Sequence, residues 1–308
     1  MTLEDLGYRK ELEKFRKEQQ LDSFGIGRVI KVHKDRYIVR TASAELECEL
    51  IGHLRYTIDD KSELPAVGDW VAIAEYDVEK ALIHAVLPRT SKLERKAIGK
   101  EGQSQIIATN IDTGLIIQSI NRDFSINRLE RYITICNNSA IEPVVVLSKI
   151  DLVEEQELEA LLTQLKERIK NTPVYAISNL SQEGIDDLKS VLQKGKTYCL
   201  LGSSGVGKST LINILSGEQM MVTGEISKSI DRGNRELIVL EYGILIDNPG
   251  MREIGITDSQ KGMEMTFDEI SSLSKECKYS DCTHTNEDEC AVLEAMENGQ
   301  LSYETYAL

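Results

Sequence analysis

The first third of the chain is a series of short apolar runs separated by turn residues. The runs are Gly25–Val32, Tyr37–Thr41, Leu46–Ile51, Gly68–Ile73 and Ala81–Leu87. Short strands in close succession are typical of a small barrel, and an OB-fold is the leading candidate. We expect Trp70 to plug the barrel core rather than to stack on bases, because the few aromatic residues here are not interleaved with Lys or Arg.

After Pro88 the pattern changes to strands that alternate with helices. The polar stretch Arg89–Gln105 reads as a linker between the two patterns. The expected strands beyond it are Thr113–Gln118, Val144–Leu147, Val174–Ile177, Thr197–Leu201, Leu237–Leu240 and Ile244–Ile246. Apolar residues at helical spacing predict helices over Ile126–Asn138 and Glu154–Ile169 that pack on a sheet. This alternation predicts an α/β fold with a largely parallel sheet.

Negative charge is distributed unevenly. The chain carries −15 at pH 7, of which residues 1–97 contribute −1, residues 98–260 contribute −6 and residues 261–308 contribute −8. Any contact with nucleic acid therefore belongs mainly to the first third, because phosphate binding needs local cations. The basic candidates there, for which an ordinary solvated strand edge is an equal alternative, are Arg28, Lys31, Lys34, Arg36 and Arg40.

Nothing in the sequence predicts membrane insertion or export. The longest apolar runs, such as Val144–Leu147, are far shorter than a membrane-spanning helix, and Met1-Thr2-Leu3-Glu4-Asp5 is acidic where a signal peptide is basic. Cys48, Cys136 and Cys199 stand singly in apolar stretches, as small buried hydrophobes do. We therefore expect a cytoplasmic protein without membrane contact or disulfides.

Residues Gly202-Ser203-Ser204-Gly205-Val206-Gly207-Lys208-Ser209 form a complete phosphate-binding loop. The loop follows an expected strand and opens an expected helix, Ser209–Leu215, which favours it over a plain glycine-rich turn. Its backbone N–H groups would surround phosphate oxygens, Lys208 would reach the β and γ phosphates, and Ser209 would ligate Mg²⁺, with Thr210 next to it.

A second phosphate-side element follows the expected strand Ile244–Ile246. It reads Asp247-Asn248-Pro249-Gly250. A carboxylate at this position can hold Mg²⁺ through water, and the N–H of Gly250 can face the γ phosphate. By itself the tetrapeptide is only a turn signal, but its place after a strand and downstream of a phosphate loop favours the functional interpretation.

The tetrapeptide Ser148-Lys149-Ile150-Asp151 is a candidate guanine reader. Asp151 can accept hydrogen bonds from the ring N–H and the exocyclic amine of guanine, a pair of donors that adenine lacks, while the Lys149 stem can cover the base. Ser178-Asn179, after the next strand, could supply a backbone N–H to the guanine carbonyl; for both segments a plain solvated loop is the alternative. In ordinary GTP-binding domains the phosphate loop precedes the base reader, so the reversed order predicts the same fold cut open and rejoined elsewhere.

Cys277, Cys282, His284 and Cys290 place three thiols and an imidazole within fourteen residues. Four soft ligands match a tetrahedral structural zinc site in a reducing compartment. The spacing is not the common finger pattern, but scattered cysteines without a metal explain it less well. We expect one zinc ion that stabilises a small C-terminal unit and takes no part in catalysis.

These elements, in this order, resemble the circularly permuted, small-ribosomal-subunit-dependent GTPases known as RsgA or YjeQ/YloQ. The resemblance covers residues 24 to 300 and includes Val67-Gly68-Asp69-Trp70-Val71, Ala108-Thr109-Asn110-Ile111-Asp112 and Arg128-Leu129-Glu130-Arg131-Tyr132. It implies an OB-fold barrel that contacts rRNA (24–97), a permuted GTPase domain (98–260) and a helical zinc-binding domain (261–308). Before the barrel, Leu3, Leu6, Leu12 and Phe15 among charges predict an amphipathic helix in the segment 1–23.

The resemblance further implies a GTPase that acts late in maturation of the small ribosomal subunit, is stimulated by it, and uses GTP/GDP and Mg²⁺; we expect a monomer.

Two departures from the family pattern bear on this expected activity. Ser148 stands where the family's base reader usually has asparagine, which shortens an anchor between the base and phosphate loops. Gly233-Asn234-Arg235-Glu236 lacks the histidine and threonines of the family's first switch. The alternatives are a nucleotide-gated assembly factor with little hydrolysis and an ATPase unrelated to ribosomes.

Overall fold

The computed structural model describes residues 1–33, 36–57, 61–96, 104–121, 124–217 and 236–247, and in the C-terminal part residues 273–274, 276–279, 282–285 and 289–298. Lys34, the first-switch residues 233–235 and the segment Asn248–Gly250 lie outside these ranges. No helix within them is long and apolar enough to cross a membrane.

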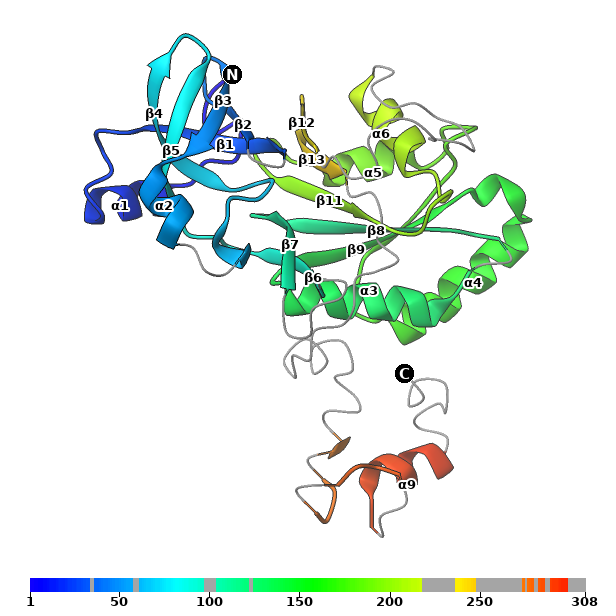
Figure 1. Ribbon diagram of the computed structural model, residues 1–308. Coiled ribbons are helices and arrows are strands. Elements are labelled where there is room, and N and C mark those ends of the chain that lie inside the picture. The colour runs from blue at the N-terminus through cyan, green and yellow to red at the C-terminus, as the bar shows by residue number, and fades with distance from the viewer. Residues whose placement is uncertain are drawn as a thin grey trace.

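The N-terminal strands close into the expected barrel (Figure 1). They are β1 (Gly25–Val32), β2 (Tyr37–Arg40), β3 (Glu45–Leu50), β4 (Trp70–Asp77) and β5 (Lys80–Val86). β1 pairs with both β2 and β4, and β3 runs parallel to β5, so the order β1-β2-β3-β5-β4 returns to β1. A short helix, α2 (Gly52–Thr57), and a 3₁₀ turn, η1 (Lys61–Glu63), occupy the connection from β3 to β4.

Trp70 is buried, but not inside the barrel. Val71 and Ile73 of β4 pack with the barrel interior, so the alternation of the strand directs Trp70 outward. There it packs with Leu6 and Leu12 of the N-terminal segment, whose helix α1 spans Lys10–Glu18, and its ring meets that of Tyr8 edge-on with centroids 5.0 Å apart. The expectation of a plug in the barrel core was therefore wrong about the face, although burial of the ring was confirmed.

The central region is a twisted sheet with helices on both faces. Its strands are β8 (Thr113–Ser119), β9 (Glu142–Ser148), β10 (Val174–Ile177), β11 (Thr197–Leu201), β12 (Glu236–Leu240) and β13 (Gly243–Asp247). They lie in the order β10-β9-β8-β11-β13-β12, all parallel except the edge strand β12. α3 (Ile126–Asn138) and α4 (Glu155–Arg168) cover one face, whereas α5 (Ile185–Val191) and α6 (Lys208–Ser216) cover the other (Figure 1).

The polar stretch predicted as a linker contains a hairpin instead. β6 (Lys92–Lys96) pairs antiparallel with β7 (Ser104–Thr109). The reason is a set of apolar residues hidden among polar ones: Leu93 of β6 and Ile106, Ile107 and Ala108 of β7 are buried, while Lys92 is exposed. These buried apolar residues fix a hairpin here that composition alone did not reveal.

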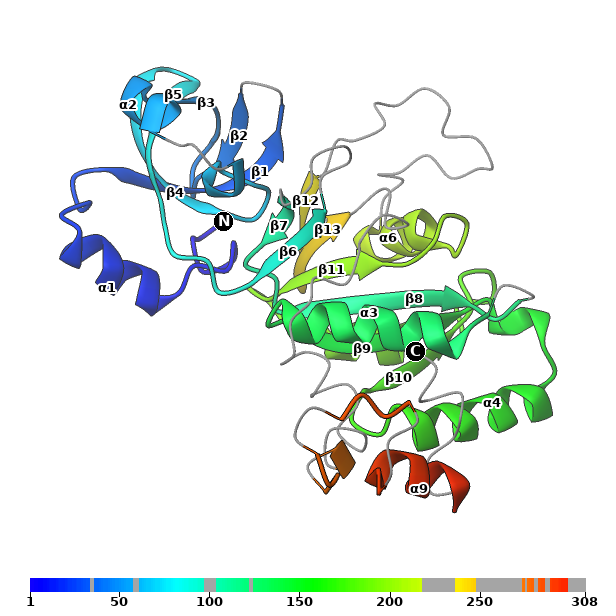
Figure 2. The same cartoon turned by 60° about the horizontal axis from the view of Figure 1, so that its bottom comes forward.

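The barrel and the central sheet meet at a buried junction (Figure 2). β1 also pairs with β12, through Lys31 and Glu236, so the barrel extends the sheet at its edge. Arg28 is 1% exposed and donates to the carbonyl oxygens of Leu6 (2.7 Å), Gly68 (3.0 Å) and Asn110 (3.0 Å), and to Thr197 Oγ1 at the start of β11 (2.9 Å). Arg28 therefore joins three parts of the chain.

Most of the basic residues proposed as RNA contacts form ion pairs or hydrogen bonds within the protein instead. Arg28 is wrong as an RNA contact because it is buried. Lys31, Arg36 and Arg40 pair with Glu236, Glu47 and Glu45. The described part of this strand edge is thus closer to the alternative of an ordinary, ion-paired surface.

Candidate nucleotide and metal sites

The phosphate loop connects β11 to α6 in a conformation that requires glycine. Gly202 has a φ of +151°, and a Cβ there would lie 2.3 Å from the carbonyl oxygen of Ile117. Gly207, with a φ of +98°, is the residue before the first turn of α6. Ser203, Ser204, Gly205 and Val206 form the bend between them. The backbone therefore closes on the N-terminus of a helix, where N–H groups and the helix dipole favour an anion.

Lys208 lies over this loop. Its ammonium donates to the carbonyl oxygens of Gly202 (2.8 Å) and Ser203 (2.6 Å). Burial lowers the pKa of Lys208, while the nearby carboxylate of Asp247 acts in the opposite direction. A phosphate beside this ammonium would offset the cost of burying its charge. Ser209 and Thr210 follow in the first turn of α6.

Four polar segments come together at the carboxyl ends of neighbouring strands. The phosphate loop follows β11, Asp247 ends β13, Ser148 ends β9 and Ser178 follows β10. Because β10, β9, β8, β11 and β13 are parallel neighbours, these ends share one edge of the sheet. Ligands of open α/β sheets bind at this edge. The base-reader strands β9 and β10 thus precede β11 in the chain yet flank the same site, as the reversed motif order predicted.

The base-reading loop is ordered by its own hydrogen bonds. Lys149 has a φ of +62°, and the 3₁₀ turn η2 (Ile150–Leu152) carries Asp151. Asp151 accepts a hydrogen bond from the hydroxyl of Ser178, which itself accepts from the backbone N–H groups of Leu180 (3.2 Å) and Ser181 (3.1 Å). The carboxylate is therefore oriented by the loop after the next strand.

Two side chains connect the base loops to the phosphate loop. The hydroxyl of the fully buried Ser148 donates to the carbonyl oxygen of Val206 at 2.7 Å. The amide of Asn179 donates to the carbonyl oxygen of Gly207 at 3.0 Å. Ser148, although shorter than the expected asparagine, therefore still forms a hydrogen bond with the phosphate loop. The contact of Asn179 was not predicted from the sequence, which gave Asn179 a backbone role only.

The Cys/His cluster closes around one point. The four ligand atoms of Cys277, Cys282, His284 and Cys290 lie within 4.8 Å of one another. Cys277 Sγ lies 3.8 Å from Cys290 Sγ and 3.6 Å from His284 Nδ1, which lies 3.3 Å from Cys290 Sγ. Tetrahedral zinc with ordinary bond lengths gives edges of about 3.8 Å between thiolates and about 3.6 Å between thiolate and imidazole. The donor set and its spacing are therefore compatible with zinc.

The cluster stabilises the thiolate form of one ligand. Partial burial works to raise the pKa of the Cys277 thiol, but the backbone N–H groups of Val292 and Ala291 and the neighbouring thiols outweigh it, and the net shift is downward. These N–H groups belong to the start of α9 (Ala291–Glu297), which packs Val292 and Ala295 beside the ligands. Metal ligation needs the thiolate, so the N–H groups at the start of α9 favour the form of Cys277 that can bind a metal, whereas burial raises the pKa of Cys282 to about 11.

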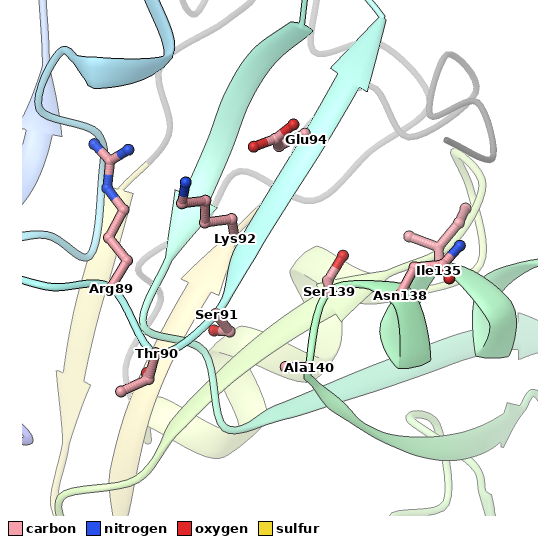
Figure 3. Close-up of a pocket in the computed structure, with 9 residues that line it drawn as sticks. All are labelled: Arg89, Thr90, Ser91, Lys92, Glu94, Ile135, Asn138, Ser139 and Ala140. Atoms are coloured by element: carbon pink, nitrogen blue, oxygen red, sulfur yellow. The ribbon is translucent and has the colours of Figure 1, made fainter. Parts of the chain in front are cut away.

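A separate cavity of about 350 Å³ lies between the start of β6 and the end of α3 (Figure 3). It is lined by Arg89, Thr90, Ser91, Lys92, Glu94, Ile135, Asn138, Ser139 and Ala140. Arg89 is already committed, because its guanidinium forms two bonds with the buried carboxylate of Asp69 (2.8 and 2.7 Å). The carbonyl end of α3 carries negative partial charge, which disfavours a phosphate here. The cavity contains none of the predicted site residues.

Comparisons with known proteins agree with this geometry. A family model described as RsgA GTPase matches residues 86–257. The protein named small ribosomal subunit biogenesis GTPase RsgA 2 from Listeria monocytogenes serotype 4b (strain F2365) is 40% identical over 313 residues, which cover 99% of this chain and 87% of the relative. One of the same name without a number, from Methanosarcina acetivorans, is 39% identical over 280 residues, covering 89% and 74% of the two chains.

Solved structures give the same result. The crystal structure of YjeQ from Thermotoga maritima matches with a TM-score of 0.70 and 25% identity, covering 92% of this chain and 95% of that one. The structure of YloQ, described as a circularly permuted GTPase, matches with a TM-score of 0.68 and 27% identity, covering 93% and 92%. With the permuted order of its strands and a family match over more than half its length, the chain belongs to the RsgA GTPase family.

Proposed function

We propose that this protein hydrolyses GTP and acts in maturation of the small ribosomal subunit, as the names of its relatives describe for them. The observation that carries the proposal is the meeting of two motif classes at one sheet edge. The Ser148 hydroxyl of the base loop bonds to Val206 of the phosphate loop at 2.7 Å. A purine held by Asp151 would therefore have its phosphates within reach of Lys208.

On the phosphate side, the N–H groups of residues 202–207 and the Lys208 ammonium would hold the β and γ phosphates, with Thr210 adjoining them. Ser209 and Asp247 would hold Mg²⁺, directly and through water, and Gly250 would offer an N–H to the γ phosphate. When bound, Mg²⁺ neutralises charge that develops on the phosphate oxygens. The Lys208 ammonium would supply the same kind of charge stabilisation from the protein itself.

On the base side, Asp151 would accept the two guanine donors, Ser178 would hold the carboxylate in place, and the Ser178-Asn179 backbone would donate to the guanine carbonyl. The Lys149 stem would cover the base. This arrangement selects guanine over adenine because adenine offers no matching pair of donors, so an adenine base that covered Asp151 would leave its carboxylate partly unsatisfied.

The intrinsic rate is expected to be low, and stimulation by the small subunit is expected to raise it. Gly233-Asn234-Arg235-Glu236 lacks the threonines that would sense the γ phosphate, and Glu236 is paired with Lys31 at 2.6 Å rather than free to act in the site. The attacking water then needs a positioning group from elsewhere, which the ribosomal subunit would provide directly or by ordering the site.

The remaining assignments complete the proposal. One zinc ion would be held by Cys277, Cys282, His284 and Cys290 in a structural role. The domain limits would be 1–23, 24–97, 98–260 and 261–308. The protein would work as a cytoplasmic monomer, with the small subunit and its rRNA as partners.

Multiple-turnover phosphate release tests the proposal. GTP and ATP are each supplied with and without purified small subunits, with K208A as the inactive control and K189A, a half-buried lysine on α5 that pairs with Asp186, as the matched control. We expect hydrolysis of GTP alone, strong stimulation by subunits and loss of it in K208A. GTP turnover that subunits do not change, while GDP binds tightly, would contradict the catalytic part; ADP binding equal to GDP would contradict the substrate.

A further inference from the structure

The base-reading loops are fastened to the phosphate loop by an amide from an unexpected position. Ser148 is too short to span the distance that an asparagine covers, and its hydroxyl reaches Val206 only. Asn179, which follows β10, contributes a carboxamide whose Nδ2 donates to Gly207, the next carbonyl along the loop. Two consecutive carbonyls are thus bound by two side chains from two different strand ends.

The contact of Asn179 is tight and placed at a sensitive point. A Cβ on Gly207 would lie 2.6 Å from Asn179 Nδ2, so the amide lies directly against the last glycine before Lys208. Gly207 has a left-handed conformation and precedes the first residue of α6. A hydrogen bond to its carbonyl therefore fixes the peptide that orients the helix N-terminus and the lysine.

We propose that Asn179 is a positioning residue of the nucleotide site, and that its amide and the Ser148 hydroxyl together anchor the base loops to the phosphate loop, as the family resemblance implies for a single asparagine at position 148. This inference rests on the proposed guanine-nucleotide function and deepens it. Asn179 touches neither reacting atoms nor the metal in this role. It holds the phosphate loop at a fixed distance from Asp151, so that one nucleotide can satisfy both ends.

One further observation separates positioning from general stability. Asn179 Oδ1 is buried and accepts no hydrogen bond from the described part of the chain. The free-energy cost of burying this acceptor without a hydrogen bond offsets much of the stability that the Nδ2 hydrogen bond gives to the nucleotide-free protein. Removal of the amide should therefore change folding stability little while it weakens nucleotide binding, whereas a merely structural side chain would show the opposite balance.

The test measures GDP dissociation with a fluorescent GDP analogue and thermal unfolding without nucleotide, on the full chain. N179A should release GDP roughly tenfold faster than wild type, the effect of one hydrogen bond to a site held in place, with the melting temperature nearly unchanged. L180A, at the neighbouring side chain that is 84% exposed, is the matched control and should change neither quantity. Unchanged GDP dissociation in N179A, with tight binding in wild type, would overturn the inference.

A double variant that moves the amide from position 179 to position 148 makes the test more specific. S148N placed in the N179A background returns the amide to the position that the family uses, and we expect it to restore most of the slow GDP dissociation. Hydrogen exchange of free N179A should be faster across the peptide that contains residues 202–208 and should slow again in the double variant. A folded double variant with neither recovery would refute the anchoring role of the amide. If wild type itself ignores GDP, the proposed function fails instead.

Discussion

The nucleotide site and the Cys/His cluster are built by opposite means. The nucleotide site draws residues from position 148 to position 247, and each stands at the end of a strand whose two faces are buried by helices. The Cys/His cluster lies within residues 277–290, and among the C-terminal residues that the structure describes the apolar ones fully buried beside it are few, chiefly Val292 and Ala295. The first site is a product of the fold, whereas the second must supply the cross-link that a small core cannot.

The difference teaches where each site is vulnerable. Backbone hydrogen bonds and two side-chain tethers hold the phosphate loop, so loss of one contact weakens it by degrees. The thiol and imidazole groups would share one metal ion as their common partner, so loss of that ion would remove all of their attraction at once. The predictions below use this contrast, starting with the largest effect.

Removal of the metal should unfold the C-terminal unit and spare the nucleotide site. Structural zinc contributes an apparent 10–16 kcal/mol to small domains that depend on it, roughly the whole stability of such a unit. Treatment with a chelator, or C282S, should lower zinc content and open the region after residue 260 to limited proteolysis, while the GDP affinity of the central sheet stays within about twofold. An unchanged proteolytic pattern after complete zinc loss would refute the structural role.

The K208A variant should lose hydrolysis by roughly 10²–10³-fold, the size expected when one charge-stabilising donor is removed. Its melting temperature should remain close to that of wild type, because the partners of the Lys208 ammonium are loop carbonyls that water can also satisfy. Subunit-stimulated phosphate release and calorimetry measure the two quantities. A variant that keeps turnover would show that the loop does not hold the phosphates.

Arg28 tests how much the buried junction between the barrel and the central sheet stabilises the fold. R28M would leave the carbonyl groups of Leu6, Gly68 and Asn110 and the Thr197 hydroxyl without their donor, and we expect a loss of about 2–4 kcal/mol in the free energy of unfolding. Urea denaturation measures this loss. Zinc content should stay the same, since the Cys/His cluster does not depend on the junction. Loss of zinc from R28M would contradict the view that the two sites are stabilised independently.

The ion pair of Lys31 with Glu236 should matter least. Both side chains are more than a third exposed, and exposed pairs contribute about 0–1 kcal/mol. K31A should therefore shift the urea midpoint slightly, and 0.5 M salt should remove the difference between K31A and wild type. A large loss would mean that the pairing of β1 with β12 depends on this bridge rather than on its backbone.

Sequence pattern located the strands well where apolar runs are continuous. β1, β10 and β11 have the predicted limits Gly25–Val32, Val174–Ile177 and Thr197–Leu201, and α3 spans the predicted Ile126–Asn138. These elements are bounded by polar or turn residues, so local composition decides where they end. The β6–β7 hairpin was missed because Leu93, the buried residue of β6, stands between charged residues, and the buried residues of β7 follow a polar stretch.

Features that depend on long-range contacts were beyond local reasoning. The outward side of Trp70 follows from an N-terminal segment that packs over the barrel, and the burial of Arg28 follows from three distant parts of the chain closing on it. The side-chain contact of Asn179 with Gly207 likewise joins residues 28 positions apart. Motif spacing predicted the candidate site residues, but only the packed sheet revealed which side chains connect them.

Nucleotide exchange at the base tests the central claim most directly. In D151N the carboxylate becomes an amide whose N–H group suits the C2 carbonyl of xanthine instead of the guanine amine. Calorimetric titration should show wild type preferring GDP over XDP by well over tenfold, and D151N reversing that preference, as expected for hydrogen bonds to a charged group. If D151N leaves the GDP to XDP ratio unchanged, the permuted loops do not form one guanine site and the account fails.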